Sequence, residues 1–164
     1  METLWAPWRT PYILGDDARE SGCLFCNRFV ATPNVENLVL GRDEAVMVML
    51  NRYPYNNGHV MIVPREHVGQ PTALAPARWG ALQGITRDVC GVLTEVMRPQ
   101  GLNLGLNIGA AAGAGIADHL HVHIVPRWVG DTNFMPAIGA TNVISQSLAA
   151  CYDALQPEIA KLFA

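Results

Sequence analysis

The most constraining stretch of this chain runs from residue 118 to residue 127 and reads Asp-His-Leu-His-Val-His-Ile-Val-Pro-Arg. Histidine alternates with an apolar residue three times, and a period of two residues is typical of a β-strand. Leu120, Val122 and Ile124 should therefore point into a core, while the three histidines line the opposite, solvated face. Three of the five histidines in the chain fall in this segment, which favours a functional site over a chance polar face.

The spacing of these histidines limits what they can bind. Neighbours on one face of a strand lie roughly 6.5–7 Å apart, so two of them can share a zinc ion. The third lies roughly 13 Å from the first, so a single metal ion cannot bind all three. Two other interpretations remain open. One is an imidazole nucleophile that attacks phosphorus, with neighbouring donors stabilising the developing charge. The other is a nucleotide-binding module without chemistry.

Composition restricts the class of protein. The chain has 164 residues, of which 50% are hydrophobic and 15% charged, and these values predict one compact domain. Its net charge is −3 and its basic residues form no cluster, which argues against binding to long nucleic acids. No apolar run approaches the ~18–20 residues of a membrane span. The first residues lack the pattern of a signal peptide, so we expect no membrane association and a cytoplasmic location.

Hydrophobic periodicity predicts strands followed by a helix, and the short links between the first three strands predict that they form an antiparallel meander. Apolar residues three and four positions apart predict a helix over 76–97, and a last helix is expected at about 142–163, continuing past Pro157. The segment 45–50 is apolar on both faces and should be a central strand. Gly41-Arg42-Asp43 reads as a turn. The strands expected besides the histidine strand are 37–40, 45–50, 59–63 and 102–108.

The first thirty residues combine an aromatic segment with a pair of cysteines. Residues 1–14 contain two tryptophans and two prolines, which favours an extended strap over a lid or base-stacking edge for a ligand. Cys23 and Cys26 form a Cys-x-x-Cys pair on a loop, which in a reducing compartment indicates metal binding or redox chemistry. Cys90 and Cys151 fall in helical patterns and should be packing residues.

Several motifs together resemble the histidine triad (HIT) superfamily. His119-Leu-His121-Val-His123-Ile-Val matches its defining motif, in which each histidine is followed by a hydrophobic residue. Asn51-Arg-Tyr-Pro54 followed by Gly58-His59 and four hydrophobic residues is similar to a second family segment. The sequences at 126–134 and at the N-terminus resemble the FHIT-like branch of dinucleoside polyphosphate hydrolases and phosphorylases. The family loop Gly-Gln-Thr-Val is replaced here by Ala-Gly-Ile-Ala at 114–117.

The resemblance implies a nucleotidyl-histidine mechanism. His121 would attack the α-phosphorus of a dinucleoside polyphosphate such as diadenosine tri- or tetraphosphate, and water would release the nucleotide. Inorganic phosphate as the second nucleophile, or binding with little turnover, are the alternatives. The resemblance also assigns supporting roles. His123 and His59 would serve the phosphate side, and the substrate would contact Asn51, Asn107 and the backbone N–H groups of Gly115 and Ile116.

The resemblance also implies a structural zinc ion. Zinc-bearing relatives use a Cys-x-x-Cys pair, a histidine shortly after the second family segment, and the first histidine of the triad. By position, these ligands are Cys23, Cys26, His67 and His119, a closed tetrahedral set. The ion would attach the N-terminal loop to the histidine strand.

The predicted fold is accordingly an α+β HIT fold: about five antiparallel strands, a long helix packed on the sheet, and a C-terminal helix. Residues 1–164 would form one domain, with the strap and Cys-x-x-Cys loop at 1–30, the core at 37–136 and the last helix at about 142–163. The family is commonly a homodimer with sheets joined across subunits, and the exposed side of the 76–97 helix with Trp79 is a candidate interface.

Overall fold

A single antiparallel sheet of five strands organises the computed structural model, which describes residues 21–132 and 143–164. The predicted strap at 1–14 lies outside the described residues. The strand order is β1-β2-β3-β5-β4, and every neighbouring pair is antiparallel. The predicted five-stranded antiparallel sheet is therefore confirmed. The strands are β1 (Val39–Arg42), β2 (Val46–Leu50), β3 (Val60–Pro64), β4 (Gly101–Leu106) and β5 (Val122–Arg127).

The antiparallel meander predicted for the first three strands is confirmed, and the strand order changes after it. Helix α3 (Pro76–Met97) follows β3 and has 22 residues, about 33 Å of helix, which is enough to carry the chain along the sheet. The chain then enters β4 at the far edge, and β5 returns between β4 and β3. The histidine strand thereby occupies an inner position, where both of its edges are paired.

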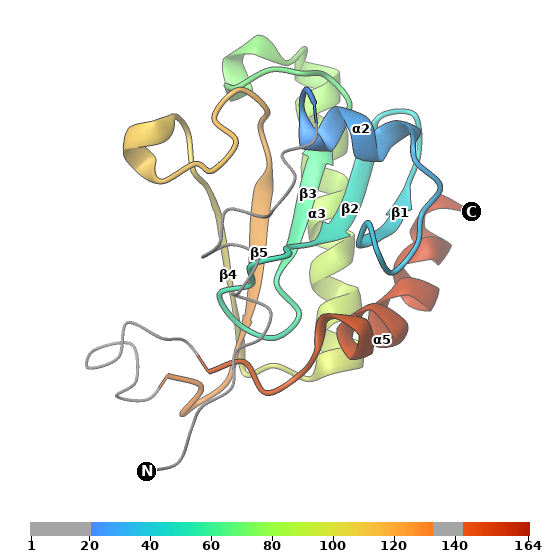
Figure 1. Cartoon of the computed structure of the whole chain (residues 1–164), viewed down its shortest axis with the longest axis vertical. Coiled ribbons are helices and arrows are strands. Elements are labelled where there is room, and N and C mark those ends of the chain that lie inside the picture. Colours follow the sequence, from blue (N-terminus) through green and yellow to red (C-terminus); the bar gives the residue numbers. More distant parts are fainter. Residues whose placement is uncertain (1–20, 133–142) are drawn as a thin grey trace.

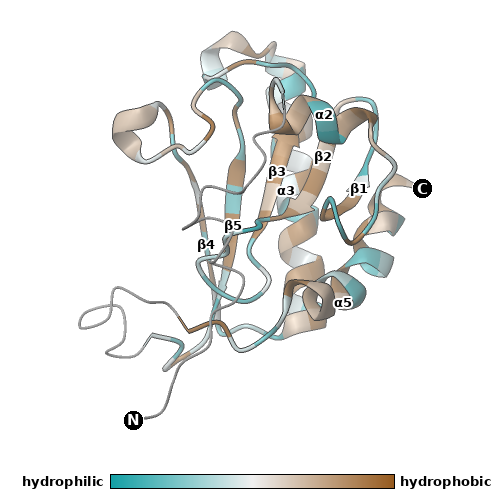
Figure 2. Cartoon of the chain, viewed as in Figure 1, coloured by the Kyte–Doolittle hydropathy of each residue, from teal (hydrophilic) through white to brown (hydrophobic). Residues whose placement is uncertain are grey.

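The sheet is covered on both faces. Val48 of β2 and Ile62 of β3 point to the side occupied by α3 and α5 (Leu148–Ala160), and this side forms the larger core. Met49 and Met61 point to the other side, where they pack on the short helix α2 (Leu24–Val30). Figure 1 shows α3 behind the strands and α2 in front of them, and Figure 2 shows that β2 and β3 are hydrophobic along their length. The central position predicted for residues 45–50 is confirmed.

The helices follow their predicted patterns closely. The bounds of α3 agree with the predicted 76–97, and Pro76 occupies its first turn. Helix α5 begins later than predicted because Ser147 caps it, its side chain accepting a hydrogen bond from the Ala150 amide. The helix passes Pro157 as expected, and a 3-10 turn, η4 (Lys161–Phe163), follows. Two further 3-10 turns are η2 (Pro71–Ala73) and η3 (Ala110–Ala112).

The turn predicted at residues 41–43 was placed too early. Gly41 belongs to β1, where the Phe163 ring lies so close that a Cβ atom would be 2.7 Å from it. The turn instead forms at Asp43, whose carboxylate accepts hydrogen bonds from the Ala45 and Val46 amides. Glycine here permits a close approach by the C-terminal segment, and the sequence cannot distinguish that role from a turn.

The histidine segment differs from its prediction in two respects. The strand begins at Val122, because the Leu120 amide bonds to the Val68 carbonyl and not to a sheet neighbour. The histidines are also not solvated: His119, His121 and His123 are 0%, 5% and 8% exposed. Leu120, Val122 and Ile124 do enter the core as predicted. The prediction that the histidines lie on the face opposite the core residues was correct. The prediction that this face is solvated was wrong, because α2 covers the side of the sheet from which the histidines project.

Helix α2 was not predicted. The prediction that the Cys-x-x-Cys pair lies on a loop is therefore wrong. Cys23 is the residue before the helix and Cys26 lies in its first turn. A seven-residue helix is unstable alone, and this one is held by Phe25 and Phe29, four residues apart, which are buried on the sheet.

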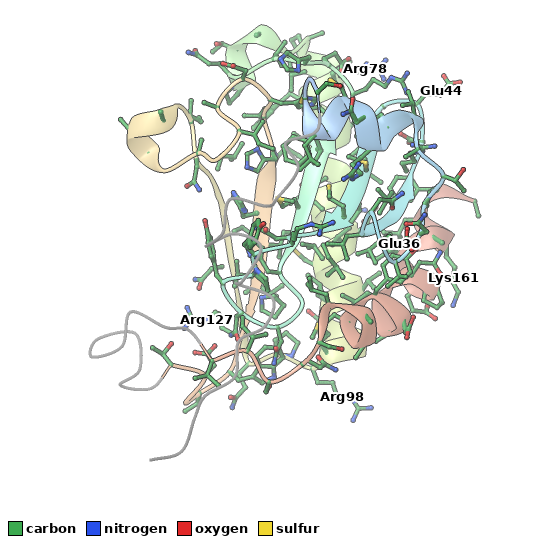
Figure 3. The ribbon with its side chains drawn as sticks, viewed as in Figure 1. Glu36, Glu44, Arg78, Arg98, Arg127 and Lys161 are labelled. Atoms are coloured by element: carbon green, nitrogen blue, oxygen red, sulfur yellow. The ribbon has the colours of Figure 1, made fainter. Side chains whose placement is uncertain are left out.

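Charged side chains lie on the periphery. Figure 3 shows Arg78, Arg98, Arg127 and Lys161 on widely separated parts of the surface, so these four form no joint basic patch. Among the described residues, no helix combines the length and apolar character needed to cross a membrane. Cys151 is buried and Cys90 packs against the core, as predicted for packing cysteines.

Candidate active site and metal-binding cluster

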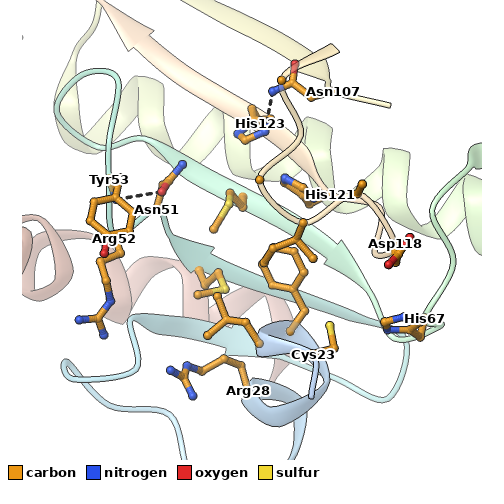
Figure 4. Close-up of a pocket in the computed structure, with 18 of the residues that line it drawn as sticks. Cys23, Arg28, Asn51, Arg52, Tyr53, His67, Asn107, Asp118, His121 and His123 are labelled. Atoms are coloured by element: carbon orange, nitrogen blue, oxygen red, sulfur yellow. Dashed lines mark hydrogen bonds between the residues drawn. The ribbon is translucent and has the colours of Figure 1, made fainter. Parts of the chain in front are cut away.

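A cavity of about 1010 Å³ opens beside α2 on the histidine side of the sheet. Its wall brings together segments far apart in the sequence: α2, the end of β2 with the loop that follows, and the segment before β5 (Figure 4). Six of the predicted site residues line it, namely Asn51, Asn107, Gly115, Ile116, His121 and His123. His67 and Cys23 of the predicted metal set lie at its edge.

His121 is oriented by the backbone beside it. Its Nδ1 lies 2.9 Å from the His119 carbonyl oxygen. A carbonyl can only accept, so Nδ1 carries the proton and donates it. Neutral His121 therefore has its lone pair on Nε2, the ring nitrogen left for the cavity. Burial lowers the pKa of His121, so the neutral form predominates near pH 7. The result is an imidazole poised to act as a nucleophile.

A chain of hydrogen bonds gives His123 the opposite tautomer. The Tyr55 amide donates to Nδ1 of His59 at 3.1 Å, so neutral His59 carries its proton on Nε2. That proton is donated to Nδ1 of His123, 2.9 Å away. His123 must then carry its own proton on Nε2, where it can donate to a phosphate oxygen. The side-chain Nδ2 of Asn107 lies 3.5 Å from this Nε2. Because an amide NH₂ and a ring N–H both donate, the Asn107 amide must turn its oxygen toward the ring to accept the Nε2 proton.

Burial keeps this pair uncharged. Desolvation, together with the neighbouring imidazoles, lowers the pKa of His59 to about 3. Desolvation and nearby His121 lower the pKa of His123 to about 4. His59 is fully buried and does not line the cavity, so it can act only through His123. We therefore describe His59 as a positioning residue and not as a residue that touches substrate.

The remaining predicted substrate contacts also line the cavity. The Asn51 side chain accepts a hydrogen bond from the Tyr53 amide, which fixes the side chain at the end of β2. Gly115 and Ile116 line the cavity after the turn at Gly113, whose φ of +85° suits glycine. Ile116 also packs against the α2 side of the sheet. These side chains and backbone groups are placed where a bound nucleotide could reach them.

The four predicted metal ligands form one cluster. The nearest donor atoms of Cys23, Cys26, His67 and His119 all lie within 4.8 Å of one another. Nδ1 of His119 is 3.3 Å from Cys23 Sγ, and Nδ1 of His67 is 3.4 Å from Cys26 Sγ. Separations of this size suit four ligands around one tetrahedral zinc ion.

The chemistry of these donors also fits zinc. Nε2 of His119 donates to the Pro64 carbonyl at 2.8 Å, which leaves the lone pair of Nδ1 directed at the thiols. Burial raises the pKa of the Cys26 thiol, and the neighbouring Cys23 adds to the shift. Two thiolates side by side would therefore need a cation to stabilise them. The donor set is closed, with two sulfur and two nitrogen ligands, as in structural zinc sites.

Comparison with known proteins identifies the family. The HIT domain model matches residues 32–129, which include β1 to β5 and the whole histidine segment. The chain belongs to the HIT domain family. The resemblance stated from its motifs is thereby confirmed.

Individual relatives agree with this assignment. An "AP-4-A phosphorylase" of Mycobacterium tuberculosis is 39% identical over 90% of this chain and 79% of its own length. A "Bis(5'-nucleosyl)-tetraphosphatase [asymmetrical]" of Schizosaccharomyces pombe is 31% identical over 59% of this chain and 53% of its own. A Zn-bound histidine triad family protein of Mycobacterium smegmatis superposes with a TM-score of 0.67 at 22% identity, covering 87% of this chain and 96% of its own. This likeness confirms the HIT fold.

The structure adds residues that sequence reasoning missed. Phe25 lies between the cysteines in sequence and contacts the rings of both His119 and His121. Tyr55 contacts the rings of His59 and His123. The position of Phe25 within the Cys-x-x-Cys pair was a usable signal. Tyr55 could be recognised only once the loop it occupies had been placed against β5.

Proposed function

We propose that this HIT protein is a dinucleoside polyphosphate phosphorylase that uses diadenosine tetraphosphate and inorganic phosphate. The observation that carries the proposal is the pair of opposite tautomers at His121 and His123, one offering a lone pair and the other a proton. The comparisons favour the phosphorylase alternative over the hydrolase expected first, since the relative with 39% identity is named a phosphorylase.

The proposed reaction has two displacements at one phosphorus atom. Nε2 of His121 attacks the α-phosphorus, the bond to the bridging oxygen breaks, and ATP leaves. An oxygen of inorganic phosphate then attacks the same phosphorus, the bond to His121 breaks, and ADP is released. The sum is diadenosine tetraphosphate plus phosphate giving ATP plus ADP. His123 would donate from Nε2 to a phosphate oxygen and offset the charge that develops there.

Substrate contacts are proposed on the cavity wall. Asn51 would contact the ribose, Asn107 the phosphates, and the backbone N–H groups of Gly115 and Ile116 would hold phosphate oxygens, as small-residue turns do. A zinc ion bound by Cys23, Cys26, His67 and His119 would have a structural role. It would cross-link α2 to the segment that leads into β5.

Product analysis tests this function. Diadenosine tetraphosphate is incubated with the protein, with and without inorganic phosphate, and the nucleotides are separated. We expect equal amounts of ADP and ATP only when phosphate is present, and a nucleotidyl adduct on His121 by mass spectrometry when it is omitted. AMP in place of ADP would identify a hydrolase. Stable binding without any product or adduct would identify a binding module.

We also propose a homodimer joined through the β4 edge. Edge strand β1 is covered, since the Tyr152 hydroxyl donates to the Val39 carbonyl and Phe163 packs on Gly41. Among the strands of the described residues, β4 pairs only with β5, and Leu104 on it is 52% exposed. An apolar edge strand is suited to pairing with a second copy. The exposed side of α3 with Trp79 stays the alternative interface, although Trp79 itself is partly buried against the core.

A further inference from the structure

Tyr55 makes several contacts with the two histidines that serve the phosphate side. It lies in the loop between β2 and β3, at the cavity wall. Its ring centroid is 4.6 Å from that of His59, and 5.9 Å from that of His123 with an interplanar angle of 27°. Tyr55 is 55% exposed, whereas His59 is fully buried and His123 is 8% exposed. The tyrosine ring therefore lies between the histidine pair and the solvent.

The backbone of Tyr55 acts on the same pair. Its amide donates to Nδ1 of His59, and this bond sets the direction of the chain of hydrogen bonds that ends at Nε2 of His123. The loop that carries Tyr55 is fixed to the end of β5. The Asn56 side-chain amide donates to the Pro126 carbonyl at 3.1 Å and to the Asp131 carboxylate at 2.7 Å. Ring and amide are thus presented by an anchored loop.

We propose that Tyr55 is a positioning residue for the phosphate-side histidines. Its ring excludes water from the His59–His123 hydrogen bond and keeps both imidazoles oriented, so that the Nε2 proton of His123 points into the cavity. Tyr55 acts through His123, and its kinetic consequences rest on the proposed function. The contacts involve the ring and not the hydroxyl, which makes no hydrogen bond to the described residues. Phenylalanine at residue 55 should therefore preserve the orientation of both histidines.

Substitutions at residue 55 test the proposal in the full-length protein. Tyr55→Phe keeps the ring, Tyr55→Leu keeps an apolar cover without it, and Tyr55→Ala opens the pair to water. Turnover of diadenosine tetraphosphate with phosphate should be unchanged in Tyr55→Phe. In Tyr55→Ala and Tyr55→Leu we expect kcat to fall by about tenfold, with KM changing by less than about threefold, since the loss concerns orientation and not ground-state binding.

A spectroscopic measurement makes the test independent of turnover. Nitrogen-15 NMR of the histidines, on nucleotide-free protein at pH 7.5, reports which ring nitrogen carries the proton. We expect His59 and His123 to hold single Nε2–H tautomers in the wild type and in Tyr55→Phe. The backbone amide of residue 55 is present in every variant, so any change must come from the water and ring motion that the tyrosine ring prevents. On that ground we expect the same resonances to shift toward a mixture of tautomers in Tyr55→Ala and Tyr55→Leu.

The contrary outcomes are distinct from one another. A rise in KM at constant kcat would mean that the ring binds a substrate base, and it would overturn the proposal. Unchanged tautomers in both the alanine and leucine variants would also overturn it. A decrease of kcat in Tyr55→Phe as large as that in Tyr55→Ala would overturn it as well. If the wild type does not turn over the substrate, the proposed function fails, and the NMR comparison still decides the role of Tyr55.

Discussion

Two histidines on one strand segment acquire different roles because their hydrogen-bond partners differ. His121 donates from Nδ1 to a carbonyl, whereas His123 accepts at Nδ1 from another imidazole. The alternation in the sequence makes them equivalent, and only the partners determine which nitrogen faces the cavity. Each of the two arrangements leads to its own prediction.

Replacement of His121 should remove the nucleophile without removing the site. We expect His121→Asn to lower kcat by at least about 10⁴-fold, the scale seen when a covalent nucleophile is lost. Nucleotide affinity, measured by calorimetry with a non-hydrolysable analogue, should remain within about tenfold, because the cavity wall is otherwise intact. No adduct should form. Turnover within tenfold of the wild type would contradict the assignment.

The buried neutral histidines should make stability sensitive to acid. Because the pKa values of His59 and His123 are lowered to about 3 and about 4 in the folded state, the unfolded chain binds protons first as the pH falls below about 6.5. Stability should be fully present above that pH and decrease between about 6.5 and 4, by up to about 1.4 kcal/mol per pH unit for each histidine.

Urea denaturation between pH 7.5 and pH 4.5 measures this slope. The control is His59→Gln, which keeps a buried polar side chain but removes one of the titrating groups. Its slope should be smaller than that of the wild type. Equal slopes for the two proteins would show that His59 does not titrate in this way.

At the scale of elements, the segment before β5 depends on a close contact with the segment after β3. A Cβ atom on Gly69 would lie 2.7 Å from the Ala117 carbonyl oxygen, and the Val68 carbonyl accepts from the Leu120 amide. Gly69→Ala should displace the segment that presents the triad, and we expect a loss of about 1–3 kcal/mol in the free energy of unfolding, with lower turnover.

Gly80→Ala is the matched control for that substitution. Gly80 lies in α3, and a Cβ atom added there would meet no atom within 4 Å. Alanine should stabilise the helix at this position by about 0.5–1 kcal/mol without changing turnover. Thermal and urea unfolding of both variants provide the comparison. If Gly69→Ala left the free energy of unfolding unchanged, the two segments could move apart without destabilising the protein, and the predicted role of this contact would be wrong.

The short helix α2 should depend on the metal cluster. We expect the purified protein to contain about one zinc ion per chain, and Cys26→Ser to lose it and to unfold at a lower temperature. Cys90→Ser, at a thiol outside the cluster, should keep its zinc. Metal content by mass spectrometry and thermal unfolding test both statements. An unchanged Tm after complete removal of zinc by a chelator would contradict a structural role.

At the scale of the molecule, the two edges of the sheet differ, and this difference leads to the proposed dimer. We expect the wild type to sediment as a dimer and Leu104→Lys to sediment as a monomer, because a charge at the strand edge opposes pairing. Val30→Lys is the control, since Val30 is 76% exposed on α2, away from β4. A monomeric wild type would contradict the proposal.

We also propose that residues 1–164 form one domain.

Local periodicity and motif spacing were sufficient to predict the fold class and most of the site. They predicted the bounds of the long helix, the central position of residues 45–50, the core face of Leu120, Val122 and Ile124, and the family. These features depend on neighbours in the chain, which a sequence displays directly. The cluster of four metal-ligand candidates was also anticipated, through the family resemblance.

What surrounds those residues depends on contacts between distant segments, which only the folded chain reveals. Helix α2 is stabilised because Phe25 and Phe29 pack against the sheet. The helix in turn buries histidines that the alternating pattern alone predicted to be in solvent. The strand order depends on where α3 leads the chain. The tautomer of His121 depends on the His119 carbonyl, which is near in sequence but is turned toward the ring only in the folded chain. The tautomer of His123 depends on His59 and on the Tyr55 amide, which lie far from the triad in sequence. Burial and the hydrogen bonds of His123 arise from segments distant in the chain, so no local pattern encodes them.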